Sequence, residues 1–167
     1  LKTDDPIAFA LPYDDVDLRK KGLKNSPIPR DKIVISGFPV RGACQKEYSP
    51  EAIRLLKCKH GMRDQHLSIT LILGTTGNRM LLEYTQELAK LSNEDFCLPL
   101  QLNICVGRNE KIRKTILQWL LDQGGSVLSE NAIFTTVKAK NGLIFHLRKF
   151  TKDLIEIMVG SDLIITK

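Results

Sequence analysis

A strand, a glycine turn and a helix follow one another between residues 67 and 91, and this unit constrains the fold more than any other stretch. The apolar run 67–73 predicts a buried strand, and Gly74-Thr75-Thr76-Gly77 predicts a sharp turn after it. Leucine and tyrosine side chains then recur at helical spacing as far as Leu91. Glycine tolerates positive φ, and the free amides of a first helical turn attract negative charge, so the turn is a candidate phosphate loop. Chain reversal alone is the alternative explanation of such a turn.

The same alternation of elements continues along the chain. Short apolar strands are expected at 33–37, 100–106, 142–147 and 163–166, with helices that begin after Ser49, after Asn109 and at Thr151. Near-continuous apolar strands that alternate with amphipathic helices indicate an α/β fold with a parallel sheet covered by helices on both faces. Residues 126–140 leave three possibilities open, which are one strand, two strands and an ordered loop.

The predicted topology also selects a ligand site. In open parallel sheets, ligands bind beyond the carboxyl ends of the strands. The turns at 74–77, 107–109 and 150–151 all follow such ends, and we therefore expect them to form one crevice. Arg41 follows the strand at 33–37 and could meet an anionic ligand, although a solvated surface arginine is the commoner outcome. Trp119 lies on the apolar stripe of its helix and is expected to be a packing residue.

Composition narrows the class of partner. The chain has 167 residues and a net charge of +6, which favours anionic ligands, while the 6% of aromatic residues form no basic stripe that would suggest nucleic acid. Four cysteines and three histidines show no metal-ligand spacing, so we expect reduced thiols, no metal site, and a cytoplasmic protein. Cys105, inside an apolar strand, is expected to behave as a small hydrophobic residue. No apolar run is long enough to span a bilayer, and no signal peptide is recognisable.

The proline-punctuated residues 1–30 have no core-forming pattern and are expected to be a linker or a remnant of a preceding domain. Residues 31–167 would then form the ligand-binding domain. Because the chain begins with Leu1 and ends at Lys167 within an apolar strand run, we expect both ends to have been cut from something longer.

Several segments together resemble the donor-binding half of GT-B glycosyltransferases. The group in question contains monogalactosyldiacylglycerol synthase, processive diacylglycerol glucosyltransferases and the peptidoglycan-precursor N-acetylglucosaminyltransferase. Residues 31–41, Asp-Lys-Ile-Val-Ile-Ser-Gly-Phe-Pro-Val-Arg, resemble the crossover between the two domains of that group. Gly74-Thr75-Thr76-Gly77 resembles its Gly-Gly-Ser-x-Gly loop, with Leu73 at the first glycine. Residues 106–109, 150–154 and 161–167 resemble its second strand end, its uracil contact and the start of its donor signature.

The resemblance implies transfer of a hexose from a UDP-sugar to a lipid acceptor such as diacylglycerol, with no other cofactor. It implies that Phe150 packs against uracil and that the backbone of Thr151 reads the base edge. Donor contacts are further implied for Arg41, Gly74, Thr75, Thr76, Gly77, Gly107 and Arg108. No residue is a candidate for the catalytic base, and the Pro-Gly-Gly loop and acidic residue of the family are not present after Lys167. We therefore expect no transfer by this chain alone, and peripheral membrane contact through its basic surface.

Two other functions share the predicted crevice. One is a non-catalytic, Rossmann-like nucleotide-binding or regulatory module, which needs no chemistry at the site. The other is a UDP-sugar epimerase, which needs carboxylates in the crevice. The carboxylates of Asp153 and Asp162 are expected to have structural roles instead.

Overall fold

The structure is a computed structural model that describes residues 9–11, 33–35, 46–74 and 79–166. The chain divides into two compact units, Leu1–Lys46 and Glu47–Lys167. In the first unit, β1 (Phe9–Leu11) pairs in parallel with β2 (Ile33–Ile35), and Phe9 lies opposite Ile33. Strand β2 covers residues 33–35 of the strand predicted at 33–37, and residues 36 and 37 lie outside the described part of the chain. The domain boundary between residues 30 and 31 stays a prediction.

The second unit is built on a six-stranded sheet with the order β5-β6-β7-β4-β3-β8. Its strands are β3 (Leu67–Ile72), β4 (Leu100–Gly107), β5 (Ser126–Glu130), β6 (Phe134–Lys138), β7 (Ile144–Lys149) and β8 (Leu163–Thr166). Strands β8, β3, β4 and β7 are parallel, as the alternation of strands and helices predicts. The result is a Rossmann-like α/β fold with one antiparallel addition at its edge.

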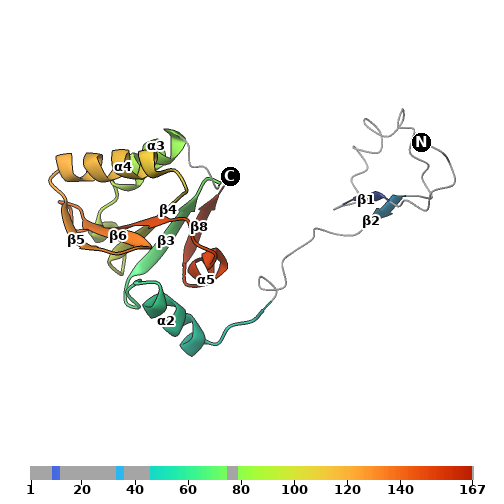
Figure 1. The fold of residues 1–167 in the computed structure, drawn as a ribbon. Coiled ribbons are helices and arrows are strands. Elements are labelled where there is room, and N and C mark those ends of the chain that lie inside the picture. The colour runs from blue at the N-terminus through green and yellow to red at the C-terminus, as the bar shows by residue number, and fades with distance from the viewer. Residues whose placement is uncertain (1–8, 12–32, 36–45, 75–78, 167) are drawn as a thin grey trace. The chain divides into compact units, whose positions relative to one another are not determined.

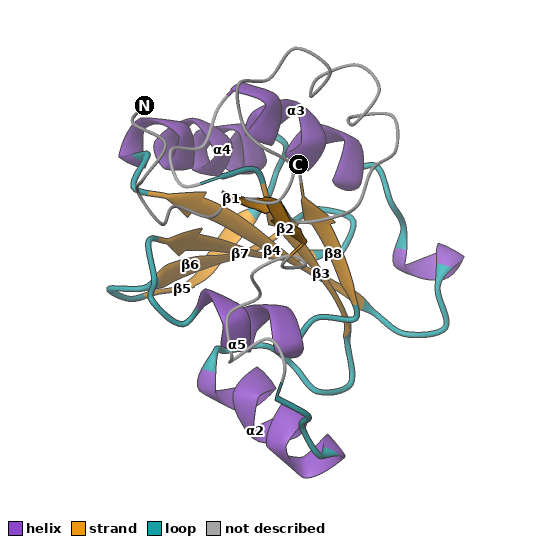
Figure 2. Cartoon of the chain, turned by 90° about the vertical axis from the view of Figure 1, so that its right-hand side faces the viewer, coloured by secondary structure: helices purple, strands orange, loops and turns teal. Residues whose placement is uncertain are grey.

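Helices cover both faces of this sheet, which confirms the predicted arrangement (Figures 1 and 2). Helices α3 (Arg79–Leu88) and α4 (Glu110–Asp122) lie on one face. Helices α2 (Pro50–Lys59) and α5 (Leu154–Val159) lie on the other. A short 3₁₀ turn at Asn93–Asp95 precedes β4.

The predicted helix starts are correct for α2 and α4 and wrong for α5. The hydroxyl of Ser49 accepts from the amide of Ala52 (3.2 Å), and the carboxamide oxygen of Asn109 accepts from the amide of Ile112 (3.0 Å). Thr151 does not cap α5, because its hydroxyl accepts from the amide of Asp153 (3.0 Å) and so closes a turn before the helix. Asp153 occupies the N-cap position of α5 and makes no side-chain capping bond.

Residues 126–140 form an antiparallel hairpin of β5 and β6, which decides among the three possibilities left by the sequence. Strand β6 also pairs antiparallel with β7, so the hairpin extends the sheet at the side of β7. All five residues of β5 are exposed, and a register shift between Val127 and Ser129 distorts this edge strand. A bulge of this kind discourages pairing with another chain at the sheet edge.

The two faces of the sheet differ sharply in polarity, which the description of the strands as near-continuously apolar does not anticipate. Under α3 and α4 the central strands bury a cluster of apolar side chains, among them Leu71, Leu102 and Ile104, all fully buried. Under α2 and α5 the same strands present buried Thr70, Asn103 and other polar residues. Strand residues alternate between faces, so the polar residues at every second position all lie on one side.

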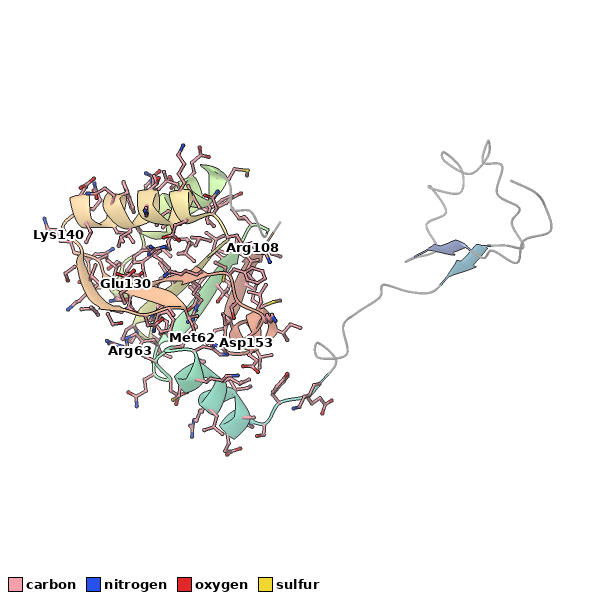
Figure 3. All side chains as sticks on the ribbon, in the orientation of Figure 1. Met62, Arg63, Arg108, Glu130, Lys140 and Asp153 are labelled. Atoms are coloured by element: carbon pink, nitrogen blue, oxygen red, sulfur yellow. The ribbon has the colours of Figure 1, made fainter. Side chains whose placement is uncertain are left out.

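Hydrogen bonds satisfy much of this polar face and fix the chain that crosses it. The Gln101 carboxamide accepts from the amide of Arg63 (2.8 Å) and donates to the carbonyl of the same residue (2.7 Å). The side-chain nitrogen Nδ2 of Asn103 lies 3.3 Å from the sulfur of Met62. Met62 and Arg63 follow α2 and lie below the sheet in the view of Figure 3. Side chains of β4 thus bind the 60–66 segment at the backbone of Arg63 and the sulfur of Met62, although this segment is not a strand of the sheet.

Ion pairs attach α2 to α5 and to the start of β3. Oδ2 of Asp162 accepts from the amide of Ser68 (2.7 Å) and lies 3.3 Å from Nζ of Lys57. Oε2 of Glu156 lies 2.5 Å from Nζ of Lys59 and 2.8 Å from Nε2 of His60. Asp162 therefore has the structural role that the sequence suggested for it.

Candidate functional site

A hollow of about 110 Å³ lies where the carboxyl ends of three neighbouring parallel strands meet. It is lined by Ile72, Gly74, Cys105, Gly107, Lys149, Phe150, Thr151 and Leu154. Ile72 and Gly74 end or follow β3, and Cys105 and Gly107 lie at the end of β4. The other four come from the end of β7, the chain after it and the first residue of α5. The structure thus gathers at one edge the residues of three turns that are far apart in the sequence, at the place where α/β sheets bind ligands.

Glycine is required at two positions of this edge. Gly74 has a φ of +94° and Gly107 a φ of +63°, which side chains with a Cβ rarely adopt. A Cβ at Gly74 would meet no atom within 4 Å among those described, so the backbone there borders open space. The register of β4 against β7 shifts between Cys105 and Gly107, and this irregularity turns the end of β4 at the hollow.

Phe150 and Arg108 contact each other beside the hollow. The guanidinium carbon of Arg108 lies 4.4 Å from the centroid of the Phe150 ring, within the range of a cation–π interaction. Phe150 is 45% exposed, so this side chain at the end of β7 is not part of the core. A large aromatic side chain that stays this exposed next to a hollow is available to a planar ligand.

The described charged side chains that line the hollow or contact its lining are basic, and the carboxylate of Glu110 interacts with one of them, Lys149, from the start of α4. Lys149 lines it and Arg108 lies next to it, and none of the described residues that line it is an aspartate or a glutamate. Cys105 contributes no charge, because burial raises the pKa of its thiol to about 11. The hollow therefore suits an anionic ligand, and Cys105 is not a thiolate nucleophile at neutral pH.

The other predicted site residues fall outside the described part of the chain. These are Arg41, Thr75, Thr76 and Gly77. Of the predicted residues that are described, Gly74, Gly107, Phe150 and Thr151 line the hollow and Arg108 contacts Phe150.

No protein-family model and no curated protein matches this sequence. Function must therefore be argued from the site itself. Within the described residues, no cluster of three or more histidine, cysteine, aspartate or glutamate side chains could hold a metal ion. The helices described are also all too short or too polar to cross a membrane.

Sequence reasoning missed Lys149, Cys105, Ile72 and Leu154 as lining residues. Lys149 directly precedes Phe150 at the end of β7, so the rule about carboxyl ends of strands would have included it. Ile72 lies two residues before Gly74, and Cys105 lies two residues before Gly107. Both side chains are on the face of the sheet that α5 covers. Strict alternation along β3 and β4 would have placed both on the side of the sheet where the hollow opens.

Proposed function

We propose that this chain is the donor-binding part of a glycosyltransferase that transfers a hexose from a UDP-sugar to a lipid acceptor such as diacylglycerol. The observation that carries the proposal is the meeting of Gly74, Gly107 and Phe150 around one positively charged hollow at the carboxyl edge of a Rossmann-like sheet. These are residues for which the resemblance to GT-B enzymes implied donor contacts.

The hollow would hold only part of a nucleotide-sugar. Its 110 Å³ is roughly the volume that four water molecules occupy in the liquid, which suffices for one ring or one phosphate group. In the proposed complex, uracil packs against the half-exposed ring of Phe150. The pyrophosphate lies over Gly74 and Gly107, where the backbone can approach closely.

Transfer needs a group that stabilises the charge developing on the UDP leaving group. Arg108 and Lys149 supply positive charge at the hollow, and such preorganised charge acts without a metal ion. A base must also take the proton of the acceptor hydroxyl. The described residues that line the hollow include no carboxylate or histidine, so we assign the base to another part of the enzyme.

The test is an isothermal titration calorimetry measurement, in which the intact chain is titrated with UDP, UDP-glucose, UDP-galactose and GDP. We expect the uridine nucleotides to bind and GDP to bind more weakly. Phe150→Ala and Lys149→Gln should each weaken UDP binding about tenfold. Lys152→Gln is the matched control, because this exposed lysine is three residues from Lys149 and does not line the hollow.

A binding module without chemistry is the second candidate, and it is favoured because the described residues that line the hollow include no carboxylate or histidine. It predicts the same nucleotide binding. The two candidates separate when the chain is assayed together with an acceptor-binding domain, because only the transferase then converts UDP-galactose or UDP-glucose. An epimerase needs crevice carboxylates, but neither Asp153 nor Asp162 lines the hollow, and Asp162 is held by Lys57 and Ser68 instead.

A further inference from the structure

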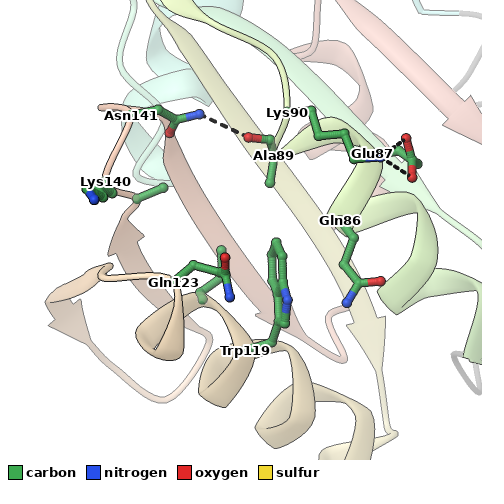
Figure 4. A pocket seen from close by; sticks show the side chains of 10 residues that line it. Gln86, Glu87, Ala89, Lys90, Trp119, Gln123, Lys140 and Asn141 are labelled. Carbon is green, nitrogen blue, oxygen red and sulfur yellow. Dashed lines mark hydrogen bonds and ion pairs between the residues drawn. The ribbon is translucent and has the colours of Figure 1, made fainter.

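A second and larger hollow, of about 760 Å³, lies at the opposite end of β7. It opens between the C-terminal ends of α3 and α4 and the turn that joins β6 to β7 (Figure 4). Its lining comprises Gln86, Glu87, Ala89, Lys90, Trp119, Leu120, Gln123, Ala139, Lys140 and Asn141. Lys140 beside it and Arg108 beside the first hollow lie at opposite ends of the sheet in Figure 3. The two hollows are therefore separate sites.

The indole of Trp119 forms the flat wall of this hollow. Trp119 is partly buried and packs against the apolar core with part of its ring, as the sequence predicted. The rest of the ring lines the hollow. In Figure 4 the indole stands between the carboxamides of Gln86 from α3 and Gln123 from α4. An indole that lines a hollow and is flanked by amides offers both an apolar surface and hydrogen-bonding groups.

The two carboxamides have no hydrogen-bond partner among the described residues, although Gln86 is only partly exposed. The carboxamide of Asn141 in the same hollow differs, because its hydrogen bonds are made within the protein. Its Nδ2 donates to the carbonyls of Ala89 and Leu91 (3.0 Å each). Its oxygen accepts from the amide of Leu143 (3.3 Å). Asn141 is thus a structural residue. Gln86 and Gln123 each keep a free donor and a free acceptor for a ligand.

The rim carries one carboxylate and two ammonium groups, Glu87, Lys90 and Lys140. Nζ of Lys90 donates to both carboxylate oxygens of Glu87, at 2.7 and 2.8 Å, so these two side chains neutralise each other. Lys140 is the remaining charged residue of the lining and is exposed. Among the described residues of the lining, the one unpaired charge is therefore the ammonium of an exposed lysine, and no cluster of cations lines this hollow as a phosphate site would need, so the indole and the carboxamides are the groups left to recognise a neutral ligand.

We propose that this hollow binds a neutral pyranose sugar. One face of a pyranose ring consists of C–H groups that can pack on the indole of Trp119, while its hydroxyls both donate and accept hydrogen bonds around the edge. The carboxamides of Gln86 and Gln123 lie where those hydroxyls would be. The volume is in the range of about 300 to 1,000 Å³ that is typical of small-molecule sites. The proposal does not depend on the nucleotide site.

The chain itself provides the reporter, since Trp119 is its only tryptophan. We would titrate the intact protein with methyl α-glucopyranoside, methyl β-galactopyranoside and maltose into the millimolar range and record tryptophan fluorescence. At least one sugar should give a saturable change in intensity or emission maximum. The double variant Gln86→Ala/Gln123→Ala should weaken this binding about tenfold, because it removes two ligand hydrogen bonds.

Gln118→Ala is the matched control. Gln118 lies on the exposed side of the same helix and donates to Asp122 (2.8 Å), so its removal should leave the titration unchanged. Phe150→Ala should also leave it unchanged, which separates this site from the proposed nucleotide site. The absence of a saturable change with all three sugars would overturn the proposal. So would a change that survives the double variant, or binding of UMP at this hollow that the double variant abolishes.

Discussion

Arg148 on β7 donates from Nε to the Oδ1 atom of Asn103 on β4, at 2.8 Å, in the interior of the protein. Its Nη2 donates to the carbonyl of His60 (2.6 Å), and its guanidinium lies 5.0 Å from the centroid of the Phe134 ring. Arg148 is fully buried, and none of the ion pairs among the described residues includes it. The sheet thus accommodates a buried cation with neutral acceptors and an aromatic face instead of a carboxylate.

Removing that guanidinium should be costly. Arg148→Ala leaves the acceptors of Asn103 and His60 unpaired and creates a cavity, so we expect the free energy of unfolding to fall by about 3 to 5 kcal/mol. Arg148→Lys should cost about 1 to 3 kcal/mol, because an ammonium cannot reproduce the planar geometry. Urea denaturation measures both values. Arg108→Ala is the control, because this arginine is exposed and its removal should change the free energy of unfolding by no more than about 0.5 kcal/mol. An equal loss in Arg148→Ala and Arg108→Ala would contradict this account.

Two aspartates with similar exposure should differ in their contribution to stability. The side chains of Asp162 and Asp64 are 40% and 42% exposed, but the Lys57 partner of the first is 9% exposed and the Arg54 partner of the second 68%. Asp162→Ala leaves the buried Lys57 and the amide of Ser68 unpaired, so we expect a loss of about 1 to 3 kcal/mol. Asp64→Ala breaks a solvated pair worth less than about 1 kcal/mol. Thermal and chemical denaturation of both variants should give the same order, and the opposite order would show that the Lys57 contact does not stabilise the fold.

Acid should destabilise the protein partly through His146. Burial, and then the charge of Arg148, lower the pKa of this imidazole from 6.5 to about 3, with smaller contributions from Arg63 and His66. Between those two values the unfolded chain binds a proton that the folded protein does not, so stability falls as the pH falls from about 6.5 toward 3. The slope from this group alone is at most about 1.4 kcal/mol per pH unit.

Denaturation measured at several pH values in this window should therefore show a steeper slope for the wild type than for His146→Gln. The comparison with the variant is necessary because other groups also titrate. Burial lowers the pKa of His66 as well, and hydrogen bonds from Lys59 and Arg113 lower the pKa of the Glu156 and Glu110 carboxyls. Parallel curves for the two proteins would mean that His146 is not the buried neutral group described here.

The described cysteines should react with iodoacetamide at very different rates. Cys58 and Cys97 are exposed, whereas Cys105 is buried and its pKa is raised to about 11 by burial. At neutral pH we expect Cys58 and Cys97 to be alkylated first and Cys105 to react only when the protein unfolds. Peptide mass spectrometry after timed quenching measures each site. Rapid alkylation of Cys105 in the native protein would show that the wall of the first hollow opens readily.

Much of the fold could be predicted because its elements are encoded locally. Ser49 and Asn109 cap their helices as expected, and the strands beginning at Leu67 and Leu100 were identified from apolar runs bounded by glycine or proline. The sequence left two strands at 126–140 as one of three possibilities and could not choose among them, because the outer strand β5 is exposed throughout and has no buried face to leave a periodic pattern. Phe150 and Gly107 were identified as neighbours only through the general rule about strand ends.

The sequence by itself determined the alternation of strands and helices, hence a parallel sheet with helices on both faces, because each element carries its own periodicity and caps. The tertiary structure alone decided the strand order, the polar face around Asn103 and Arg148, and the hollow beside Trp119. These features depend on which distant segments pack together. Such pairing follows from the combined burial and hydrogen bonding of the whole domain, and the local pattern of residues does not contain it.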